Sequence, residues 1–290
     1  MRYRFCLWER QDTLHGMTLW KDMTLVAFDL ETTGKYPLGA EICELAAVKW
    51  QAGKRMGTFQ SLVRPRQKMS DEVIAIHHIS NEMVLKAPPI EEVIGDFYQF
   101  LKGAYLVAHH APFDMGFLAV EFEKAGLNLH DKTLFPPVFC SSLLTRKTFP
   151  EFPNHKLQTL TQKLNVSVQQ AHRALDDSQA CLEVTLKTFK VLGEKKDKQM
   201  VEELLAFQKE NLVWERFSIK SLGSWAENVK KVIASGEAME LVYQGGSRPG
   251  QARKVWPVGL VRTPLKQGDF LVAKDEKGVI KRYFLSKIQK

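Results

Sequence analysis

Short apolar runs and amphipathic stretches alternate along the first two thirds of the chain in the way a layered α/β domain requires. The runs Met23–Leu30, Glu41–Trp50 and Met56–Val63 predict three strands, and the turn residues Gln51–Lys54 join the second and third as a hairpin. The apolar run Tyr105–Ala108 predicts a buried strand. Strands followed by alternating helices and strands favour an α/β sheet with mixed pairing.

Helices are predicted where apolar residues recur at three- and four-residue intervals or where a capping sequence begins a segment. The segment between Phe135 and Pro153 is rich in Pro and Phe and predicts a loop with one short strand near Val138–Cys140. The predicted helices begin at Ser70 and Ser80 and otherwise span about 90–101, 112–124, 156–164, 172–192, 199–212 and 224–234.

From Ala238 onward the pattern changes to short strands separated by glycine turns, which predicts a small, partly open β-barrel. The charge-rich segment Gly193–Lys198 marks the boundary before it. The chain therefore divides into an N-terminal extension (1–21), an α/β domain (22–192), a helical connector (193–235) and a β domain (236–290). The predicted strands of the β domain are Met239–Tyr243, Ala252–Arg262, Phe270–Ala273 and Val279–Leu285.

Composition is that of an ordinary globular protein, since 44% of the 290 residues are hydrophobic. No run of 18 or more apolar residues is present, and the first residues lack the apolar core of a signal peptide. The four cysteines are widely scattered without zinc-binding spacing. These features predict a cytoplasmic protein with free thiols and no membrane partner.

Charge is distributed unevenly. Residues 241–290 hold 11 Lys or Arg and 3 Asp or Glu, a net +8, which equals the net charge of the whole chain. Residues 1–240 are therefore neutral overall, and the basic character belongs to the C-terminal β domain. A basic patch of this density predicts a polyanionic partner, best matched by nucleic acid, although a lysine-rich solvated surface is the simpler alternative.

Candidate chemistry begins at the end of the first predicted strand. Asp29 and Glu31 are two positions apart, so their side chains project from the same face, roughly 7 Å apart. Neighbouring carboxylates repel each other unless a cation lies between them, and carboxylate oxygens suit Mg²⁺ or Mn²⁺. Solvated acids at an exposed strand end are the alternative for this pair alone.

Two further segments strengthen the metal interpretation. Asp114 lies in the first turn of the helix that begins at Pro112, where the helix dipole alone would also favour an acid. His172 and Asp177 are five residues apart, about 140° on a helix, and so cannot share a helical face. Both reach one site if His172 lies in the loop before the helix and Asp177 lies on it.

In this order and context, Asp29, Glu31, Asp114, His172 and Asp177 resemble the DEDDh group of the DnaQ-like 3′–5′ exonucleases. The resemblance covers about residues 22–190. Its first motif is Phe28–Gly34, its second is His109–Asp114 and its third is His172–Asp177, with a secondary match at Lys156–Leu160. His110 stands where relatives usually carry Asn. It implies an RNase H-like fold with a five-stranded sheet, two Mg²⁺ or Mn²⁺ ions held by the four acids, and His172 as the general base.

The resemblance also implies the substrate contacts and the products. Backbone groups near Thr32 and Thr33 would hold the terminal nucleotide, and nucleoside 5′-monophosphates would be released. Phe113 or Phe117 is a candidate for stacking on a base, although a core role is the simpler expectation for both. The expected substrate is a single-stranded or 3′-terminal nucleic acid, DNA before RNA, with a polymerase or repair protein as a candidate partner. The alternatives are an exoribonuclease and a non-catalytic binding or sensing protein on a nuclease scaffold.

The β domain resembles the WYL domain, a ligand- or nucleic-acid-sensing module, although Phe270 replaces part of the triplet that names it. An unrelated SH3-like barrel is the alternative. The residues expected to bind ligand or nucleic acid are Tyr243, Arg253, Arg262 and Arg282.

Overall fold

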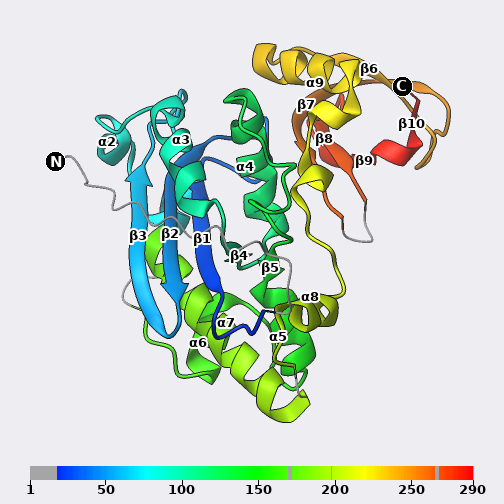
Figure 1. Ribbon diagram of the computed structural model, residues 1–290. Helices are drawn as coiled ribbons and strands as arrows, with labels where there is room; N and C mark the ends of the chain where they lie inside the picture. The colour runs from blue at the N-terminus through cyan, green and yellow to red at the C-terminus, as the bar shows by residue number, and fades with distance from the viewer. Residues whose placement is uncertain (1–17, 169–171, 197, 265–267, 290) are drawn as a thin grey trace.

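The computed structural model describes residues 18–168, 172–196, 198–264 and 268–289. These residues build two five-stranded sheets connected by helices (Figure 1). Most of the N-terminal extension, residues 1–17, lies outside the described residues. In the rest, Trp20 is buried, and its backbone N–H donates to the carbonyl of Gln199 at 3.0 Å.

The first sheet has the order β3-β2-β1-β4-β5, with β1–β2–β3 antiparallel and β1–β4–β5 parallel. This mixed sheet confirms the predicted fold class. The predicted hairpin is present, and its turn residues Ala52 and Gly53 adopt φ values of 47° and 82°. The strands are β1 Thr24–Thr32, β2 Ile42–Gln51, β3 Lys54–Leu62, β4 Tyr105–Ala108 and β5 Phe139–Cys140.

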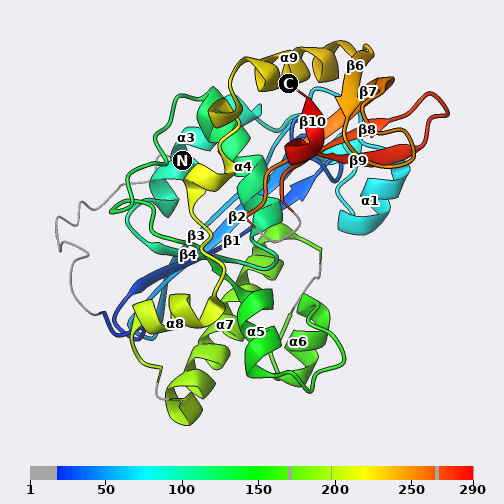
Figure 2. The same ribbon diagram turned by 90° about the vertical axis from the view of Figure 1, so that its right-hand side faces the viewer.

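Helices cover both faces of this sheet (Figure 1, Figure 2). The helices are α1 Asp71–His77, α2 Asn81–Val84, α3 Ile90–Leu101, α4 Pro112–Lys124, α5 Ser141–Thr148, α6 Leu157–Lys163 and α7 Ala174–Lys196. Helix α5 was not predicted, because its sequence is polar and lacks an apolar stripe. Tertiary contacts stabilise it instead: Ser141, Ser142, Leu144 and Thr145 are buried.

Alternation along β1 assigns its side chains to two cores. Val26, Phe28 and Leu30 belong to the core that includes residues of α3 and α4. Leu25 and Ala27 belong to the core that includes Phe189 of α7. Because side chains on a strand alternate with period two, Asp29 and Glu31 continue the α7 face. The strand therefore directs both acids toward the helix that carries the third motif.

The second sheet is antiparallel, with the order β10-β6-β7-β8-β9. Helix α9, Ser224–Ser235, packs on one of its faces, where Ala226 and Val229 share a core with residues of β6 to β9. A small C-terminal β domain is thus present, as predicted. Its strands are β6 Met239–Tyr243, β7 Ala252–Val261, β8 Phe270–Lys274, β9 Ile280–Phe284 and β10 Ile288–Gln289.

The predicted connector divides between the two cores. Helix α8, Val201–Gln208, and the turn Trp214–Phe217 pack on the first sheet's cores, whereas Ile219 already belongs to the core of the second sheet. We therefore propose a domain boundary near Ser218 in place of a separate connector.

The second sheet also contacts the loop that follows β1. A Cβ on Gly259 would lie 2.3 Å from Cβ of Tyr36, and a Cβ on Gly39 would lie 1.9 Å from the carbonyl oxygen of Val258. The N–H of Leu260 donates to the carbonyl of Pro37 at 3.2 Å. The C-terminal sheet is therefore packed directly against the loop leading out of the Asp29–Glu31 strand.

Cys43, Cys140 and Cys181 are buried free thiols, whereas Cys6 lies outside the described residues. In the described part of the chain, no helix has the length and apolar character needed to cross a membrane.

Candidate metal-dependent active site

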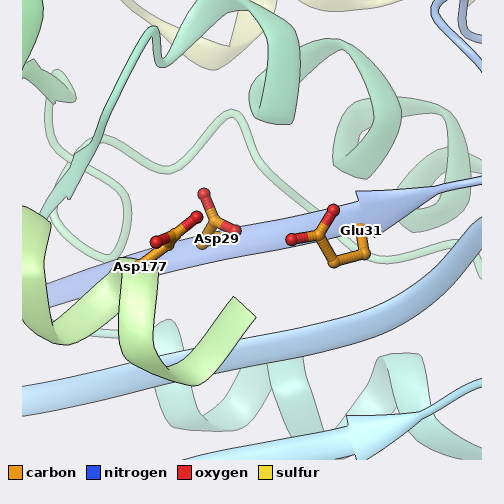
Figure 3. Close-up of side chains that lie close together, drawn as sticks. All are labelled: Asp29, Glu31 and Asp177. Carbon is orange, nitrogen blue, oxygen red and sulfur yellow. The ribbon is translucent and has the colours of Figure 1, made fainter. Parts of the chain in front are cut away.

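Three carboxylates meet between β1 and the start of α7. One carboxylate oxygen from each of Asp29, Glu31 and Asp177 lies within 4.8 Å of the others. Figure 3 shows Asp29 and Glu31 projecting from the same side of β1 and Asp177 approaching from α7. Asp177, rather than its neighbour Asp176, joins this cluster.

Asp114, the fourth predicted acid, lies outside this cluster of three but interacts electrostatically with Asp29 and Glu31. It lies in the first turn of α4 and is only 2% exposed. Burial is the main cause of its raised pKa, and the charge of Glu31 adds to it, although backbone hydrogen bonds at Asp114 and Leu30 partly offset both. Asp114 is in turn the strongest charged neighbour that raises the pKa of Asp29. All four predicted acids thus share one electrostatic environment.

This environment is unfavourable for four negative charges without a cation. Burial raises the pKa of Glu31 to about 8, with Asp177 and Glu44 contributing repulsion. Burial, followed by repulsion from its acidic neighbours, raises the pKa of Asp29 as well. A divalent cation would remove this repulsion, and an all-oxygen set is the donor chemistry that Mg²⁺ and Mn²⁺ prefer. The residues present therefore fit the predicted metal centre.

His172 occupies the loop position that the sequence requires. It is exposed, has φ of 61°, and precedes α7, whose first residue is Ala174. Its Nε2 lies 2.9 Å from the side-chain nitrogen of Gln158, an amide that can donate only to an unprotonated ring nitrogen. Asp177 lies close to His172. Burial raises the pKa of Asp177, and the charge and backbone of His172 partly offset this rise.

The predicted substrate contacts differ in accessibility. Phe117 is buried, as expected, but Phe113 is 39% exposed, so the expectation of a core role is wrong for Phe113. The hydroxyl groups of Thr32 and Thr33 are committed to the local turn: Thr32 Oγ1 donates to the carbonyl of Gly34 at 2.8 Å, and Thr33 Oγ1 accepts from the N–H of Glu41 at 2.9 Å.

An ion pair beside the acids was missed by the sequence analysis. Glu44 on β2 lies directly opposite Glu31 in the sheet and has no solvent exposure. It accepts hydrogen bonds from Arg173 Nη2 at 2.7 Å, Arg173 Nε at 3.1 Å and the N–H of Ala174 at 3.1 Å. Burial alone raises the pKa of Glu44, but hydrogen bonds from Arg173, Gln60 and Ala174 outweigh it and hold the pKa below its usual value.

This pair attaches the start of α7 to the sheet. Arg173 lies between His172 and the helix, so its bidentate contact sets where both His172 and Asp177 stand. Two sequence signals were available: a lone acid in the apolar strand Ile42-Cys43-Glu44-Leu45, and an arginine inside the third motif. Gln158 was also missed, although it lies in a secondary family match near residues 156–160.

Two adjacent histidines, His109 and His110, begin the second motif. His110, which replaces the usual Asn, has φ of 61°, and its Nδ1 lies 3.2 Å from Oγ of Ser142. The left-handed conformation is one that Asn and His adopt more readily than most residues, which explains how this exchange is accommodated. Burial, followed by the charge of His110, lowers the pKa of His109 to about 3, so its imidazole is neutral at physiological pH.

A cavity of about 230 Å³ adjoins the acids. It lies between α6 and α7 and is lined by Leu157, Gln158, Thr161, Gln162, Val168, Asp177 and Ala180. Because both Asp177 and Gln158 line it, this cavity opens directly on the third motif.

The residues predicted to bind ligand in the second sheet do not form one surface. Tyr243 is 7% exposed and packs edge-on against Tyr283. Arg253 donates to the carbonyl oxygens of Gly245 and Arg248, which closes its own turn.

Arg262 is also an internal residue. It contacts Asp269 at 2.9 Å, Oγ of Ser221 at 2.7 Å and the carbonyl of Ser218. Among the four predicted residues, only Arg282 is exposed. The side chains of Tyr243 and Arg262 thus make contacts within the β domain itself.

Comparison with known proteins agrees with the geometry of the acids. Over 172 residues, the chain is 39% identical to the PolC-type DNA polymerase III of Bacillus cereus. The alignment covers 59% of this chain and 12% of the relative. The corresponding protein of Listeria welshimeri is 30% identical over 266 residues, or 89% of this chain and 18% of the relative. The chain thus spans less than a fifth of the length of these curated relatives.

A solved structure of exonuclease I aligns with a TM-score of 0.53 at 14% identity, over 88% of this chain and 55% of that chain. Because the second sheet begins with β6 at Met239, an alignment over 88% of this chain extends into it. This likeness concerns the fold. The family model described as Exonuclease matches residues 26–185, more than half of the chain, and the chain belongs to this exonuclease family.

Proposed function

We propose that this chain is a 3′–5′ exonuclease that hydrolyses DNA and releases nucleoside 5′-monophosphates with the help of divalent metal ions. The observation that carries the proposal is the convergence of Asp29, Glu31 and Asp177 within 4.8 Å, with Asp114 buried beside them. The family resemblance implies hydrolysis from the 3′ end. The relatives are PolC-type DNA polymerases, which favours DNA over RNA as the substrate.

The four acids would hold the metal ions. When bound, Mg²⁺ or Mn²⁺ stabilises charge on the attacking and leaving oxygens of an in-line displacement and lowers the pKa of water. His172 would accept the proton of the attacking water, since an unprotonated imidazole nitrogen is a general base. Arg173 and Glu44 hold the loop in place. Because the Gln158 amide donates to the Nε2 lone pair, this 2.9 Å contact must open before Nε2 can accept the proton.

The terminal nucleotide would lie between the acids and α4. Phe113 is exposed on the first turn of that helix, 5.1 Å from the ring of Phe117, and offers a face for stacking on a base. Backbone groups at Thr32 and Thr33 remain the proposed contacts to the sugar and phosphate.

The test is hydrolysis of 3′-labelled single-stranded DNA, duplex DNA and RNA by the purified chain in Mg²⁺, with chelator as the metal control. Asp177→Asn should abolish turnover, whereas Asp176→Asn, its neighbour outside the cluster, should retain it. His172→Ala should slow turnover by about 10²–10⁴-fold while metal binding measured by calorimetry survives. Retained activity in Asp177→Asn, or loss of metal in His172→Ala, contradicts these assignments.

The other candidates make different predictions in this assay. Preference for the RNA substrate identifies an exoribonuclease, and binding without turnover on any substrate identifies the non-catalytic alternative. A polymerase or repair partner is a proposal of the same kind, supported by relatives that are PolC-type DNA polymerases. Stimulation of turnover by an added replicative polymerase would support it, and unchanged turnover would contradict it.

A further inference from the structure

The outward face of the second sheet carries a surface that the sequence analysis did not identify. Trp256, Lys274 and Ile280 lie side by side on β7, β8 and β9, because Trp256 pairs with Lys274 and Lys274 pairs with Ile280. Lys254 precedes Trp256 by two residues on β7, and Arg282 follows Ile280 by two residues on β9, so both lie on the same face as this row. Because β7 and β9 run in the same direction, Lys254 and Arg282 lie on opposite sides of the row. We call these five residues the basic platform.

The platform residues are accessible. Lys254, Lys274 and Arg282 are exposed, Ile280 is 54% exposed, and Trp256 is half-buried. The opposite face of the sheet holds Leu241, Val255, Leu271 and Tyr283, which form a core together with α9. The two faces therefore have distinct roles, one in folding and one open to a partner.

The charge of the platform is positive. Nζ of Lys254 lies 5.5 Å from the ring centroid of Trp256, and the guanidinium of Arg282 lies 5.1 Å from that of Phe270. Glu240 on β6 pairs with Lys254 on β7 and is the acidic neighbour of that lysine. Nearby Asp275 is neutralised by Lys281 at 2.6 Å. The platform thus carries three cations and one aromatic ring, and Glu240 is an acidic neighbour of Lys254.

The platform adjoins the loop that leaves the catalytic strand. Gly259 lies one row beyond Trp256, paired with Val272 after the irregularity in β7. On this row the backbone of β7 meets Tyr36, which lies five residues after Glu31 along the chain. Part of the sheet face is therefore occupied by the nuclease domain, and the exposed part continues directly from it.

We propose that the basic platform binds single-stranded nucleic acid, holding the strand whose 3′ end lies at the four acids; this deepens the proposed function and rests on it. Lys254, Lys274 and Arg282 contact phosphates, and the ring of Trp256 stacks on a base. Cations with an interleaved aromatic ring bind strands without sequence preference, as degradation of arbitrary sequence requires. An open sheet face with side chains spaced about 5–7 Å apart suits an extended polymer better than an enclosed small ligand.

The experiment uses the full chain with a fluorescent 30-nucleotide oligo-dT in chelator, so that binding is measured by anisotropy without hydrolysis. The variant Lys254→Gln/Lys274→Gln/Arg282→Gln should bind more weakly. Its log–log salt slope should be smaller by about 2, since each phosphate contact on a single strand contributes roughly 0.7. Trp256→Ala should weaken binding by about tenfold or more through lost stacking.

The matched control removes three exposed lysines from the nuclease domain, as Lys163→Gln/Lys190→Gln/Lys195→Gln. It loses the same net charge and should keep the wild-type salt slope. In Mg²⁺, the platform variants should turn over a trinucleotide at the wild-type rate while KM for the 30-mer rises. This split separates a binding role from a folding defect.

The outcomes distinguish the two proposals. Wild-type affinity and salt slope in the platform variants, or equal losses in the control variant, overturn the platform even if the chain is an active exonuclease. Selective loss of binding in a chain that hydrolyses no substrate supports the platform and overturns the proposed activity. Competition by deoxythymidine monophosphate as effective as that by the 30-mer assigns the surface to a small phosphorylated ligand and overturns the strand-binding proposal.

Discussion

The contact between Arg173 and Glu44 gives a quantitative prediction. Replacing Arg173 with Met leaves the carboxylate of Glu44 buried with two of its four hydrogen-bond donors, Gln60 Nε2 and the N–H of Ala174. Removing one partner of a buried ion pair costs about 3–5 kcal/mol, because the remaining charge stays desolvated. Arg173→Met should therefore lower the free energy of unfolding by this amount, a large fraction of the 5–15 kcal/mol typical of a domain.

The assay is urea denaturation monitored by circular dichroism. Arg66→Met is the matched control, because it removes an arginine from surface ion pairs in which its side chain is 65% exposed, and it should cost at most about 1 kcal/mol. Adding Glu44→Gln to Arg173→Met should recover part of the loss, since the unpaired charge is then absent.

The pH dependence provides an independent check. The pKa of Glu44 is lowered in the folded state, so the stabilisation is present above about pH 4.5 and is lost as the pH falls through the folded-state pKa. The difference between wild type and Arg173→Met should shrink as the pH falls below 4.5 through the folded-state pKa of Glu44. A loss below about 1 kcal/mol at pH 7, or a difference independent of pH, would refute the reasoning.

Two further predictions concern the acids and the interface between the sheets. Burial raises the pKa of Glu31 to about 8, so in chelator this group's contribution to stability is fully present below about pH 4.5 and is lost as the pH rises through about 8. Thermal melting in chelator should show this decrease with pH, and added Mg²⁺ should reverse it. The variant Glu31→Gln should remove much of the decrease. A melting temperature independent of pH in chelator contradicts the electrostatic account. Gly259→Ala places a Cβ 2.3 Å from Tyr36 and should cost about 1–3 kcal/mol through overpacking, whereas Gly57→Ala, with no atom within 4 Å, serves as its control. Equal melting temperatures for the two glycine variants would show that the contact between the sheets is not tight.

The strands and helices were predictable where local pattern and tertiary environment agree. Strand β4 and helix α4 lie where their apolar patterns and Pro112 place them. Helix α5 was missed because its helical state depends on burial against β5 and α7 rather than on an apolar stripe of its own. Local propensity cannot report such a contact.

The candidate site shows the same division. Spacing placed Asp29 and Glu31 on one face and His172 ahead of Asp177, and the motifs connected these residues with Asp114. Spacing could not reveal that Glu44 faces Arg173 across 129 residues of sequence, because the register of β2 against β1 decides it. In the second sheet, composition correctly located the positive charge but could not distinguish internal from exposed arginines, which explains the choice of Arg262.

The arrangement of charges explains why the centre needs a buried ion pair at its edge. Asp29, Glu31 and Asp177 repel one another, and this repulsion would push α7 away from β1 whenever no cation lies between them. Arg173 opposes that movement, because it joins the start of α7 to Glu44 on the neighbouring strand and leaves free the carboxylates proposed to bind metal. The pair is positioned at the one helix end that carries both His172 and Asp177. Loss of the pair should therefore affect the position of the base and of the fourth acid together, so that Arg173→Met lowers turnover even under conditions where the variant remains folded. Turnover equal to wild type in folded Arg173→Met would show that the pair contributes to stability alone.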